Sequence, residues 1–479
     1  MFLSQIIDNS SAYLIGEDKD ISVCYSYSKQ RVDGGLFFCL DGERLSGGDF
    51  VDEAEKFGAV AVVTDRILQT KLTQVIVPDA REAYSIMTAR FYGDPQNRLK
   101  VIGVVGTNGK TSTCGIVCAI FSAAGRRIGN IGTEGSFFDD LTIPAELTTP
   151  DPERLYPILK QMADGGAEYV VMEVSAHAIQ LKKVAPIKFD TLVFTNCTED
   201  HLDYFSDMER YKAVKKSIFE SAKNCKVIVN GDDDTGRELS DEIFGAVTYG
   251  IFEPADVFAT LIRESKTKTS YVLNIFDDLY EIKTGLLGTF NVYNQLAALT
   301  CAYMNGIDIA VAVRTLKTIP AVAGRMERVA TINGGDVFID YAHTPDGLEK
   351  SLLYLRKVIK GNLIVVFGCG GNRDKNKRPL MGKTAGDIAD FVIITSDNPR
   401  FEDACKIISE AEAGVREATM DYITIKDRKA AIEYGVKILK EGDALLVAGK
   451  GAENYQEIMG VKHAFSDKQV VLSLVGENV

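Results

Sequence analysis

The sequence predicts an α/β protein made of three domains. Its 479 residues exceed what one hydrophobic core usually holds. Short apolar runs alternate with helical patterns along the chain, which is typical of mostly parallel sheets with crossover helices. Polar, glycine-rich segments follow many of these runs, at the strand ends where α/β sheets bind ligands. We expect domains at residues 1–98, 99–324 and 325–479.

Composition and charge narrow the class of protein. The net charge of −13 disfavours a general nucleic-acid or membrane-surface binder. The nine cysteines are scattered without paired spacing, as expected of reduced intracellular thiols. The start of the chain lacks a basic segment and a long apolar core, and no apolar run approaches the ~20 residues of a membrane span. We therefore expect a cytoplasmic protein with no signal peptide, no membrane span and no nucleic-acid partner.

The N-terminal region predicts a small α/β unit. Its β-type runs are 35–40, 59–64 and 74–77. Its helical patterns cover 50–57 and 81–91. The segment DPQNRLK, 94–100, has the composition of a linker into the next domain.

The strongest functional signal follows this linker. The apolar run Val101–Val105 ends at GTNGKTS, 106–112, and a helical pattern begins at Thr113. Strand, glycine-containing loop and helix start are the context of a phosphate-binding loop, because backbone N–H groups and the helix N-terminus attract phosphate. The alternative is an ordinary strand–turn–helix with a glycine-rich turn.

Individual residues of this loop have distinct expected tasks. Gly106 and Gly109 let the backbone turn tightly and aim its N–H groups at phosphate oxygens. Lys110 would reach the terminal phosphates, and the Thr111 hydroxyl would meet a magnesium ion. These residues predict nucleoside triphosphate binding.

Polar clusters at later strand ends of the central region suggest a metal site. They are EVSAH at 173–177, TNCTEDHLDYF at 195–205 and YKAVKKSIF at 211–219. Magnesium prefers oxygen ligands, so Glu173 joins Thr111 as a candidate, with His201 in the neighbouring cluster. The alternatives are a surface ion pair for Glu173 and a hydrogen-bonded structural histidine for His201. Further along, Asn291 and Asn294 lie one helical turn apart on one face.

The C-terminal region predicts a second doubly wound sheet with its own ligand-binding edge. Its strand-like runs end in YAHTPDG at 341–347, GCGGNRDKNKRP at 368–379, SDNPR at 396–400 and GKGAENY at 449–455. The basic residues Arg373, Lys375, Lys377 and Arg378 either lie on a solvated loop or receive carboxylates at that edge.

Taken together, these motifs resemble those of a known family. GTNGKTS, TTPDP (148–152), MEVSAHA, FTNCTEDHLDYF, YKAVK, GTFNVYN, GRME, DYAHTPD, GCGGNRDKNKRPLMG, SDNPR and GKGAE occur in this order. The set is similar to that of the Mur ligases of peptidoglycan synthesis, and within them to those that add the third stem-peptide residue. The resemblance implies a UDP-sugar domain, a central ATPase domain and a C-terminal Rossmann-like domain. It also implies ATP-dependent amide formation through an acyl phosphate, and the absence of an evident nucleophile arrangement fits such a reaction.

The resemblance also implies roles for residues that match the family motifs. The implied ATP contacts are Gly106, Thr107, Asn108, Gly109, Lys110, Thr111, Ser112, Asn291, Asn294, Arg325 and Asp340. The implied metal-site residues are Thr111, Glu173, His201 and Lys215, with Lys215 expected as a carbamate. Lys110, His201 and Lys215 are the implied catalytic residues. The implied UDP-sugar contacts are Ser28, Thr148, Thr149, Ser175 and Lys183. The implied amino-acid pocket comprises Arg373, Asp397, Asn398, Arg400, Gly449 and Glu453.

The implied substrates are ATP, a UDP-muramoyl dipeptide and a diamino acid, with magnesium as the cofactor and a monomeric enzyme. The motif SDNPR implies meso-diaminopimelate, because Arg400 and Arg373 can bind its distal carboxylate while Glu453 holds its distal ammonium. Enzymes of the family that use lysine carry other residues at the Arg400 position.

Several positions depart from the family pattern. Tyr27-Ser28-Lys29 replaces Asp-Ser-Arg, Lys183 replaces an arginine, and Ala452 replaces a histidine. Lysine keeps the charge but lacks the bidentate geometry of arginine. One alternative is therefore a paralogous Mur-type ligase that joins L-lysine or another amino acid or acceptor.

Two more distant alternatives are weaker. A regulatory ATP-binding protein with an inactive ligase site requires loss of Lys110, Glu173 or Lys215, and all three are present. Folylpolyglutamate synthetase shares the architecture, but TTPDP, DYAHTPD and DNPR argue against it.

Overall fold

The computed structural model describes residues 1–7, 12–42, 45–200, 202–221 and 224–475. The chain forms two compact units, each built from several stretches. Unit 1 comprises Met1–Val105, Gly125–Val193 and Val214–Val227. Unit 2 comprises Gly106–Ala124, Phe194–Ala213 and Ile228–Val479. The boundaries of the three predicted domains stay a prediction.

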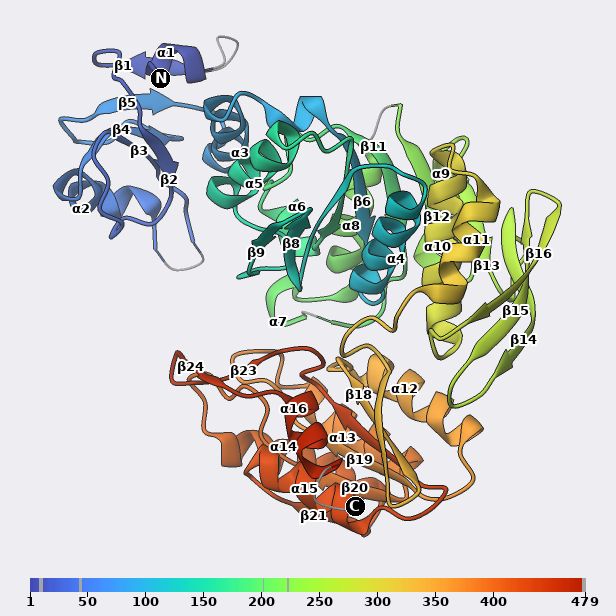
Figure 1. Ribbon diagram of the computed structural model, residues 1–479. Helices are drawn as coiled ribbons and strands as arrows, with labels where there is room; N and C mark the ends of the chain where they lie inside the picture. Colours follow the sequence, from blue (N-terminus) through green and yellow to red (C-terminus); the bar gives the residue numbers. More distant parts are fainter. Residues whose placement is uncertain (8–11, 43–44, 201, 222–223, 476–479) are drawn as a thin grey trace. The chain divides into compact units, whose positions relative to one another are not determined.

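The N-terminal part of unit 1 is a five-stranded sheet in the order β1-β5-β4-β3-β2, parallel except for β1 (Figure 1). Its strands are β1 Tyr13–Ile15, β2 Val23–Tyr25, β3 Gly35–Phe38, β4 Ala59–Thr64 and β5 Thr73–Ile76. Its helices are α1 Leu3–Ile6, η1 Gly47–Phe50, α2 Val51–Lys56 and α3 Ala80–Phe91. Alternate residues of β3 enter two separate apolar clusters, one with α1 and α3 and the other with α2. Helices therefore cover both faces of this sheet, as strands buried on both sides require.

The other strands of unit 1 are part of an 11-stranded sheet, in which they have the order β11-β6-β10-β7-β8-β9. Its strands are β6 Lys100–Val105, β7 Ile128–Gly132, β8 Gly135–Phe138, β9 Leu141–Ile143, β10 Tyr169–Val174 and β11 Phe189–Phe194. The accompanying helices are η2 Pro95–Arg98, α5 Pro152–Asp164, α6 Ala176–Gln180 and α8 Met208–Glu220. The pairs β6–β10 and β10–β7 are parallel, whereas β7, β8 and β9 pair antiparallel. Every residue of β10 is buried, which explains its uninterrupted apolar pattern up to Glu173.

Unit 2 begins with the helix α4 Lys110–Ala123, three residues earlier than its expected start. Strands β12 to β16 follow one another in sheet order, first parallel and then, from β14 to β16, antiparallel. They are β12 Lys226–Asn230, β13 Val247–Gly250, β14 Val257–Glu264, β15 Thr269–Ile275 and β16 Asp278–Thr284. The helices of this part are α7 Leu202–Phe205, α9 Asp234–Glu242, α10 Thr289–Met304 and α11 Ile309–Thr318. The antiparallel β14–β16 meander was not predicted.

The C-terminal part of unit 2 holds a six-stranded sheet in the order β17-β18-β22-β19-β20-β21. Its strands are β17 Glu327–Ile332, β18 Gly335–Asp340, β19 Leu363–Phe367, β20 Phe391–Ile394, β21 Tyr422–Thr424 and β22 Ala444–Ala448. Its helices are α12 Pro345–Val358, α13 Lys377–Ile388, α14 Ala404–Ala418, α15 Arg428–Ile438 and α16 Asp467–Val475. A hairpin of β23 Tyr455–Ile458 and β24 Val461–Ala464 lies between β22 and α16 in the chain.

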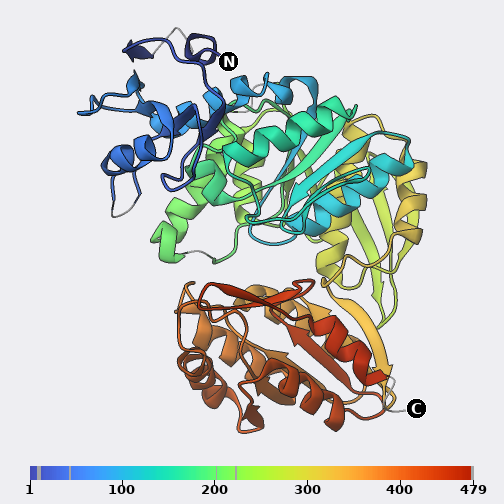
Figure 2. The same ribbon diagram turned by 60° about the vertical axis from the view of Figure 1, so that its left-hand side comes forward.

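Helices cover both faces of this C-terminal sheet (Figure 2). One apolar cluster joins the sheet to α12, α13 and α14, and another joins it to α15 and α16. All its strand pairs are parallel except β17–β18. The carboxyl ends of β18, β19, β20 and β22 therefore meet at one edge, which confirms the predicted α/β fold with a ligand-type edge. None of the helices in the described part of the chain has the length and apolar composition that a membrane crossing needs.

Candidate active site

The loop between β6 and α4 has a conformation that requires glycine. Gly109 has φ +84°, and a Cβ there would collide with the Asn294 amide. A Cβ at Gly106 would collide with the Thr195 hydroxyl. The loop is therefore held close to two other segments, and only glycine permits that approach.

Lys110 occupies the centre of this loop. Its Nζ donates hydrogen bonds to the carbonyl oxygens of Gly106 and Thr107, each at 2.8 Å. Lys110 is also the first residue of α4, where the first N–H groups of the helix have no acceptor within the helix. Both features attract phosphate oxygens, so the geometry supports the predicted task of this lysine.

Asn108 connects the loop to a residue that sequence reasoning missed. Its side-chain amide donates to Asp346 Oδ2 at 2.8 Å and to Thr198 Oγ1 at 3.2 Å, and its backbone N–H donates to Asn196 Oδ1 at 2.9 Å. Asp346 lies in the first turn of α12 and pairs with Lys350. Asp346 belongs to the recognised motif YAHTPDG, but the sequence did not indicate that it would contact Asn108.

Thr111 and Arg325, predicted from separate motifs, lie together. Arg325 Nη2 donates to Thr111 Oγ1 at 3.0 Å, and the guanidinium lies 4.2 Å from the ring centroid of Tyr341. Stacking on the ring and the hydrogen bond fix the direction of the arginine. Arg325 therefore places a positive charge at the start of α4.

A cavity of 630 Å³ lies beside the loop within unit 2. Seven of the expected ATP contacts line it, namely Asn108, Gly109, Ser112, Asn291, Asn294, Arg325 and Asp340. Asn294 Nδ2 donates to Asn291 Oδ1 at 3.0 Å, and Asn291 Nδ2 donates to Leu287 O at 2.8 Å. The spacing of the two asparagines by one helical turn thus directs both into one hydrogen-bonded chain.

The same cavity has aromatic walls that were not predicted. They come from Tyr249, Phe252, Phe290, Tyr293 and Tyr354, which are scattered along the sequence. Cavities of this size with apolar walls and a few polar groups are typical of small-molecule sites. Planar rings suit a planar ligand group such as a nucleobase.

Two ionisable groups of the cavity have shifted pKa values. Burial raises the pKa of Asp340 to about 6, against the opposing effects of the Arg325 charge and hydrogen bonds from the Ala342 and Met326 N–H groups. Burial also lowers the pKa of His343 to about 4, helped by the charge of Lys377 and opposed by Asp200. Near neutral pH the site therefore holds an ionised Asp340 and an uncharged His343.

Glu173 lies at the centre of a hydrogen-bonded cluster in unit 1. Its side chain is buried, and Thr133 donates to it through N at 2.8 Å and through Oγ1 at 3.2 Å. The Thr149 hydroxyl donates to the Glu173 carbonyl at 2.8 Å, and Ser175 N donates to Thr149 Oγ1 at 3.0 Å. The hydroxyl oxygens of Thr133 and Thr148 lie 3.1 Å apart. The alternative of a surface carboxylate is wrong, because Glu173 is only 1% exposed.

Other expected UDP-sugar contacts divide between this cluster and the N-terminal sheet. Lys183 is buried, and its Nζ lies 2.8 Å from Asp151 Oδ1 and 3.4 Å from Thr149 O. Ser28 donates to Glu53 at 2.6 Å and shares no hydrogen bond with the cluster among the described residues. Hydrogen bonds therefore link Thr148, Thr149, Ser175 and Lys183 within one cluster, whereas the hydrogen bond of Ser28 leads to Glu53.

Lys215 is fully buried on α8, so it does not belong to a solvated helix face. His201, the remaining expected metal-site residue, lies outside the described residues. Within the described ranges, no group of three or more His, Cys, Asp and Glu side chains could hold a metal ion. Thr111 in unit 2 and Glu173 in unit 1 each carry an oxygen donor of the kind that magnesium prefers, and their joint role in a metal site stays a prediction.

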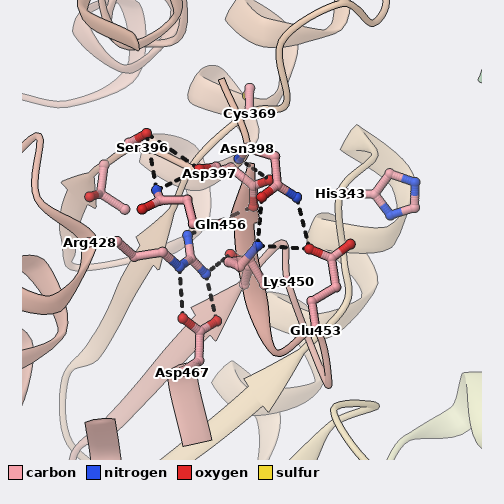
Figure 3. A network of polar contacts seen from close by, with 12 residues as sticks. His343, Cys369, Ser396, Asp397, Asn398, Arg428, Lys450, Glu453, Gln456 and Asp467 are labelled. Atoms are coloured by element: carbon pink, nitrogen blue, oxygen red, sulfur yellow. Dashed lines mark hydrogen bonds and ion pairs between the residues drawn. The ribbon is translucent and has the colours of Figure 1, made fainter. Parts of the chain in front are cut away.

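The expected amino-acid pocket lies at the carboxyl edge of the C-terminal sheet (Figure 3). Asn398 Nδ2 donates to Glu453 Oε2 at 2.8 Å, and Asn398 N donates to Asp397 Oδ1 at 2.6 Å. Gln456 Nε2 donates to the Asp397 carbonyl at 2.7 Å. The motifs SDNPR and GKGAE are therefore brought together, as the prediction of one pocket requires.

Arg400 has a constrained backbone. Its φ of +51° is in the left-handed region, its N–H donates to Glu457 O, and its carbonyl accepts from Met459 N at 2.7 Å. Its Nη1 donates to Gly371 O at 2.7 Å, and its Nε lies 3.5 Å from Glu457 Oε2. A Cβ at Gly370 would lie 3.0 Å from Arg400 Nη1 and 3.8 Å from Arg373 Cγ, so the two arginines flank this glycine.

Arg378, at the same edge of the sheet, has neither of its two predicted roles, which were solvation on a loop and binding of a substrate carboxylate. Arg378 is fully buried, with Nη2 2.9 Å from Glu402 Oε1 and Nη1 2.5 Å from Glu410 Oε2. Its hydrogen bonds lower the pKa of Glu402 to about 2. Arg378 is therefore neither solvated nor available to a substrate carboxylate.

Comparisons with known proteins extend these observations. The family profile "Mur ligase middle domain" matches residues 104–302, and "Mur ligase, glutamate ligase domain" matches 324–451. UDP-N-acetylmuramoyl-L-alanyl-D-glutamate--2,6-diaminopimelate ligase of Geobacillus thermodenitrificans is 41% identical over 470 residues, with 96% of each chain covered. The equally named protein of Aquifex aeolicus is 41% identical, with 94% of this chain and 92% of that protein covered.

Solved structures give the same result. A structure titled UDP-N-acetylmuramoyl-L-alanyl-D-glutamate--2,6-diaminopimelate ligase is 30% identical, with a TM-score of 0.67 and 95% of both chains covered. The MurF ligase of Thermotoga maritima in complex with ADP is 20% identical, with a TM-score of 0.64, 95% of this chain and 97% of that chain covered. The second likeness concerns the fold alone.

The fold and the site define a class: α/β proteins in which a glycine-containing loop joins a buried parallel strand to a helix. Full-length similarity then narrows the class. The chain belongs to the Mur ligase family and is an ATP-dependent, ADP-forming ligase.

Proposed function

We propose that this ligase adds meso-diaminopimelate to UDP-N-acetylmuramoyl-L-alanyl-D-glutamate in peptidoglycan synthesis. The observation that carries the proposal is 41% identity to relatives of that name over 96% of both chains. The paired arginines beside Gly370 support the choice of amino acid, because a distal carboxylate needs a cationic partner. The competing reading is a ligase for L-lysine.

The proposed reaction has two steps, neither of which needs a protein nucleophile. The glutamyl carboxylate of the acceptor attacks the γ-phosphorus of ATP, and the β–γ oxygen bridge breaks to give ADP and an acyl phosphate. The amine of the amino acid then attacks the acyl carbon, loses a proton and displaces inorganic phosphate. Lys110, the α4 N-terminus and Arg325 would stabilise the charge on the phosphates.

The nucleotide would bind in the 630 Å³ cavity. The phosphates would lie at Gly106–Ser112, and the aromatic walls would enclose the base. Asn291, Asn294 and Asp340 would then contact the nucleotide. Magnesium, held by Thr111 and Glu173, would supply positive charge that neutralises the phosphates.

Lys215 is proposed to carry a carbamate, formed when its neutral amine adds to CO₂ with loss of a proton. Complete burial supports this, because burial disfavours the charged form of an amine. An ammonium cannot bind magnesium, whereas a carbamate oxygen can. His201 is proposed as a second metal-site residue.

This proposal is tested by Lys215→Ala, which should lose activity and regain part of it with added acetate. Lys216→Ala, the neighbouring residue on α8, is the matched control and should need no acetate. A Lys215→Ala enzyme with normal activity, or one that a small carboxylate never rescues, would contradict the carbamate.

The UDP-sugar is proposed to contact Ser28, Thr148, Thr149, Ser175 and Lys183. The hydrogen-bonded cluster around Glu173 supports the last four of these. We also propose a monomer that acts in the cytoplasm, where ATP is available and the nine free cysteines stay reduced. Size-exclusion chromatography and cell fractionation would test these two statements.

The function is tested with a panel of amino acids, supplied with UDP-muramoyl dipeptide and ATP. Product mass identifies the amino acid joined, and phosphate release should require acceptor and amino acid together. We expect kcat/KM for meso-diaminopimelate to exceed that for L-lysine by orders of magnitude, because lysine leaves the arginines without an anion. Equal or better use of L-lysine would reject the assigned amino acid but not the ligase class.

A further inference from the structure

The GKG segment that follows β22 contains a lysine without an assigned role. Lys450 has a fully buried side chain between Gly449, with φ +115°, and Gly451, with φ +53°. Burying an ammonium is costly unless hydrogen bonds and an opposite charge compensate. Its partners therefore reveal what its burial achieves.

All the recorded partners of Lys450 belong to the expected amino-acid pocket or border it (Figure 3). Nζ donates to Glu453 Oε2 at 2.7 Å and to Asn398 Oδ1 at 3.0 Å, and it lies 5.4 Å from the ring centroid of Tyr455. The Asn398 amide in turn donates to the same Glu453 oxygen at 2.8 Å. Two of the three ammonium protons are donated to Asn398 and Glu453, and the side chain is completely buried, so Lys450 orients two pocket residues and does not itself face a substrate.

A second buried cation holds the segment that carries Lys450. Arg428, at the start of α15, donates to both carboxylate oxygens of Asp467, at 2.8 and 2.7 Å, and to the carbonyl of Ala448 at 3.0 Å. Arg428 and Asp467 are completely buried. The pair thus ties the starts of α15 and α16 to the last residue of β22, so the GKG segment has a rigid base.

The charges of this buried set nearly balance. Arg428 pairs with Asp467 and lies 4.0 Å from Asp397, and Lys450 pairs with Glu453. Two cations thus face three carboxylates, and removal of Lys450 would leave one further uncompensated negative charge beside the pocket. That charge would favour a ligand end with a lone ammonium over one that also carries a carboxylate.

We propose that Lys450 is a positioning residue that sets amino-acid selectivity by neutralising and orienting Glu453. With Lys450 in place, Glu453 presents an acceptor oxygen without adding net charge to the pocket. A diamino acid whose distal end is a zwitterion is then favoured over one whose distal end is only cationic. This inference rests on the proposed function, because it concerns the choice between these two ligands.

The test compares Lys450→Met with wild type, using meso-diaminopimelate and L-lysine. The ratio of the two kcat/KM values should fall about tenfold, while KM for ATP stays unchanged. Lys429→Met is the matched control, because Lys429 forms an exposed pair with Glu433 in the same part of the chain, and it should leave the ratio unchanged. Equal losses for both amino acids, or an unchanged ratio, would overturn the proposal.

A second measurement does not depend on turnover. Lys450→Met should lower the unfolding temperature because Glu453 is left without its cation, and adding Glu453→Gln should raise it again. If the second substitution restores nothing, Lys450 does not position Glu453 and the inference fails. A wild-type enzyme that prefers another amino acid contradicts the proposed function, whereas these unfolding temperatures still judge the ion pair.

Discussion

Lys110 and Lys450 each follow a glycine, one in the loop at 106–112 and the other beside the expected amino-acid pocket, and their surroundings differ. Lys110 donates to carbonyl oxygens of its own loop, three and four residues away. Lys450 donates to Asn398, 52 residues away, as well as to Glu453. The hydrogen bonds of Lys110 thus end on backbone carbonyls of its own loop, whereas those of Lys450 end on side chains brought together by the fold. We therefore expect substitutions at the first to affect catalysis alone, and substitutions around the second to affect stability and selectivity.

The largest effect on catalysis is expected for Lys110→Met. It should reduce turnover about a thousandfold or more, because charge on the transferred phosphoryl group loses its cation. The unfolding temperature should change much less than turnover, since the two lost hydrogen bonds end on uncharged backbone carbonyls. Phosphate release and thermal unfolding measure the two quantities. Normal turnover in a folded variant would refute the role of the loop.

The largest effect on stability is expected for Arg428→Met, which leaves Asp467 buried without its partner. The free energy of unfolding should fall by about 3–5 kcal/mol. Lys383→Met removes one partner of the exposed Lys383–Asp387 pair and should cost less than about 1 kcal/mol. Denaturant unfolding of both variants measures the difference. Equal small losses would show that the buried pair is not the base of the GKG segment.

Arg400→Ala tests whether the expected amino-acid pocket determines which amino acid the enzyme uses. It should lower kcat/KM for meso-diaminopimelate about a hundredfold and that for L-lysine much less, because only the former loses a carboxylate partner. Arg416→Ala, on the exposed side of α14, is the control and should change neither value. Equal losses for the two amino acids would mean that Arg400 supports the fold and does not read the substrate.

A smaller effect concerns Asp340 and the pH dependence of nucleotide binding. Its pKa of about 6 means that lowering the pH from 7.5 to 5.5 protonates most of it. KM for ATP should then rise about fourfold in wild type and stay level in Asp340→Asn, if the ionised form binds. Loss of stability through Asp340 would not account for this rise in KM at low pH. Between the ordinary value of 3.8 and about 6, the native carboxyl keeps a proton that the unfolded chain releases, so acidification through this window favours the native state at Asp340.

Protonation of His343 should change stability in the opposite direction to that of Asp340, and this is the smallest of the expected effects. Its pKa falls from 6.5 to about 4, so between these values the unfolded chain binds a proton that the native site excludes. Stability should therefore decline as pH falls through that window, with no contribution above it. His343→Gln should reduce the drop in unfolding temperature between pH 7.5 and 4.5 by about 2–4 °C. His463→Gln, which changes an exposed histidine of β24, should leave the drop as in wild type.

The same contrast explains what sequence reasoning could predict. Strand β4 has the predicted bounds, 59–64, because its apolar run is almost continuously buried. Phosphate binding could be predicted for the loop at 106–112 because its turn, lysine and helix start are neighbours in the chain. The β14–β16 meander was missed because buried and more exposed residues alternate along β15, so no continuous apolar run marks it.

Partners that are distant in sequence account for the misses at the site. Arg378 stands in the basic segment KNKR, which has the local pattern of a solvated loop, yet Glu402 and Glu410 lie 24 and 32 residues later. Arg428 and Asp467 are 39 residues apart and each begins a helix with no recognisable motif. Local composition does not indicate which charges the fold will pair, and so Lys450 was read only as part of GKGAE.

The left-handed backbone of Arg400 has a consequence for measurement. The main chain at this residue is bonded on both sides to the β23–β24 hairpin, through Arg400 N to Glu457 O and Met459 N to Arg400 O. These two amide protons can exchange with solvent only when the hairpin separates from the SDNPR segment. Deuterium uptake at Arg400 and Met459 therefore reports the opening frequency of the pocket wall directly. Slower uptake in the presence of an amino acid would identify its binding site even when no product forms.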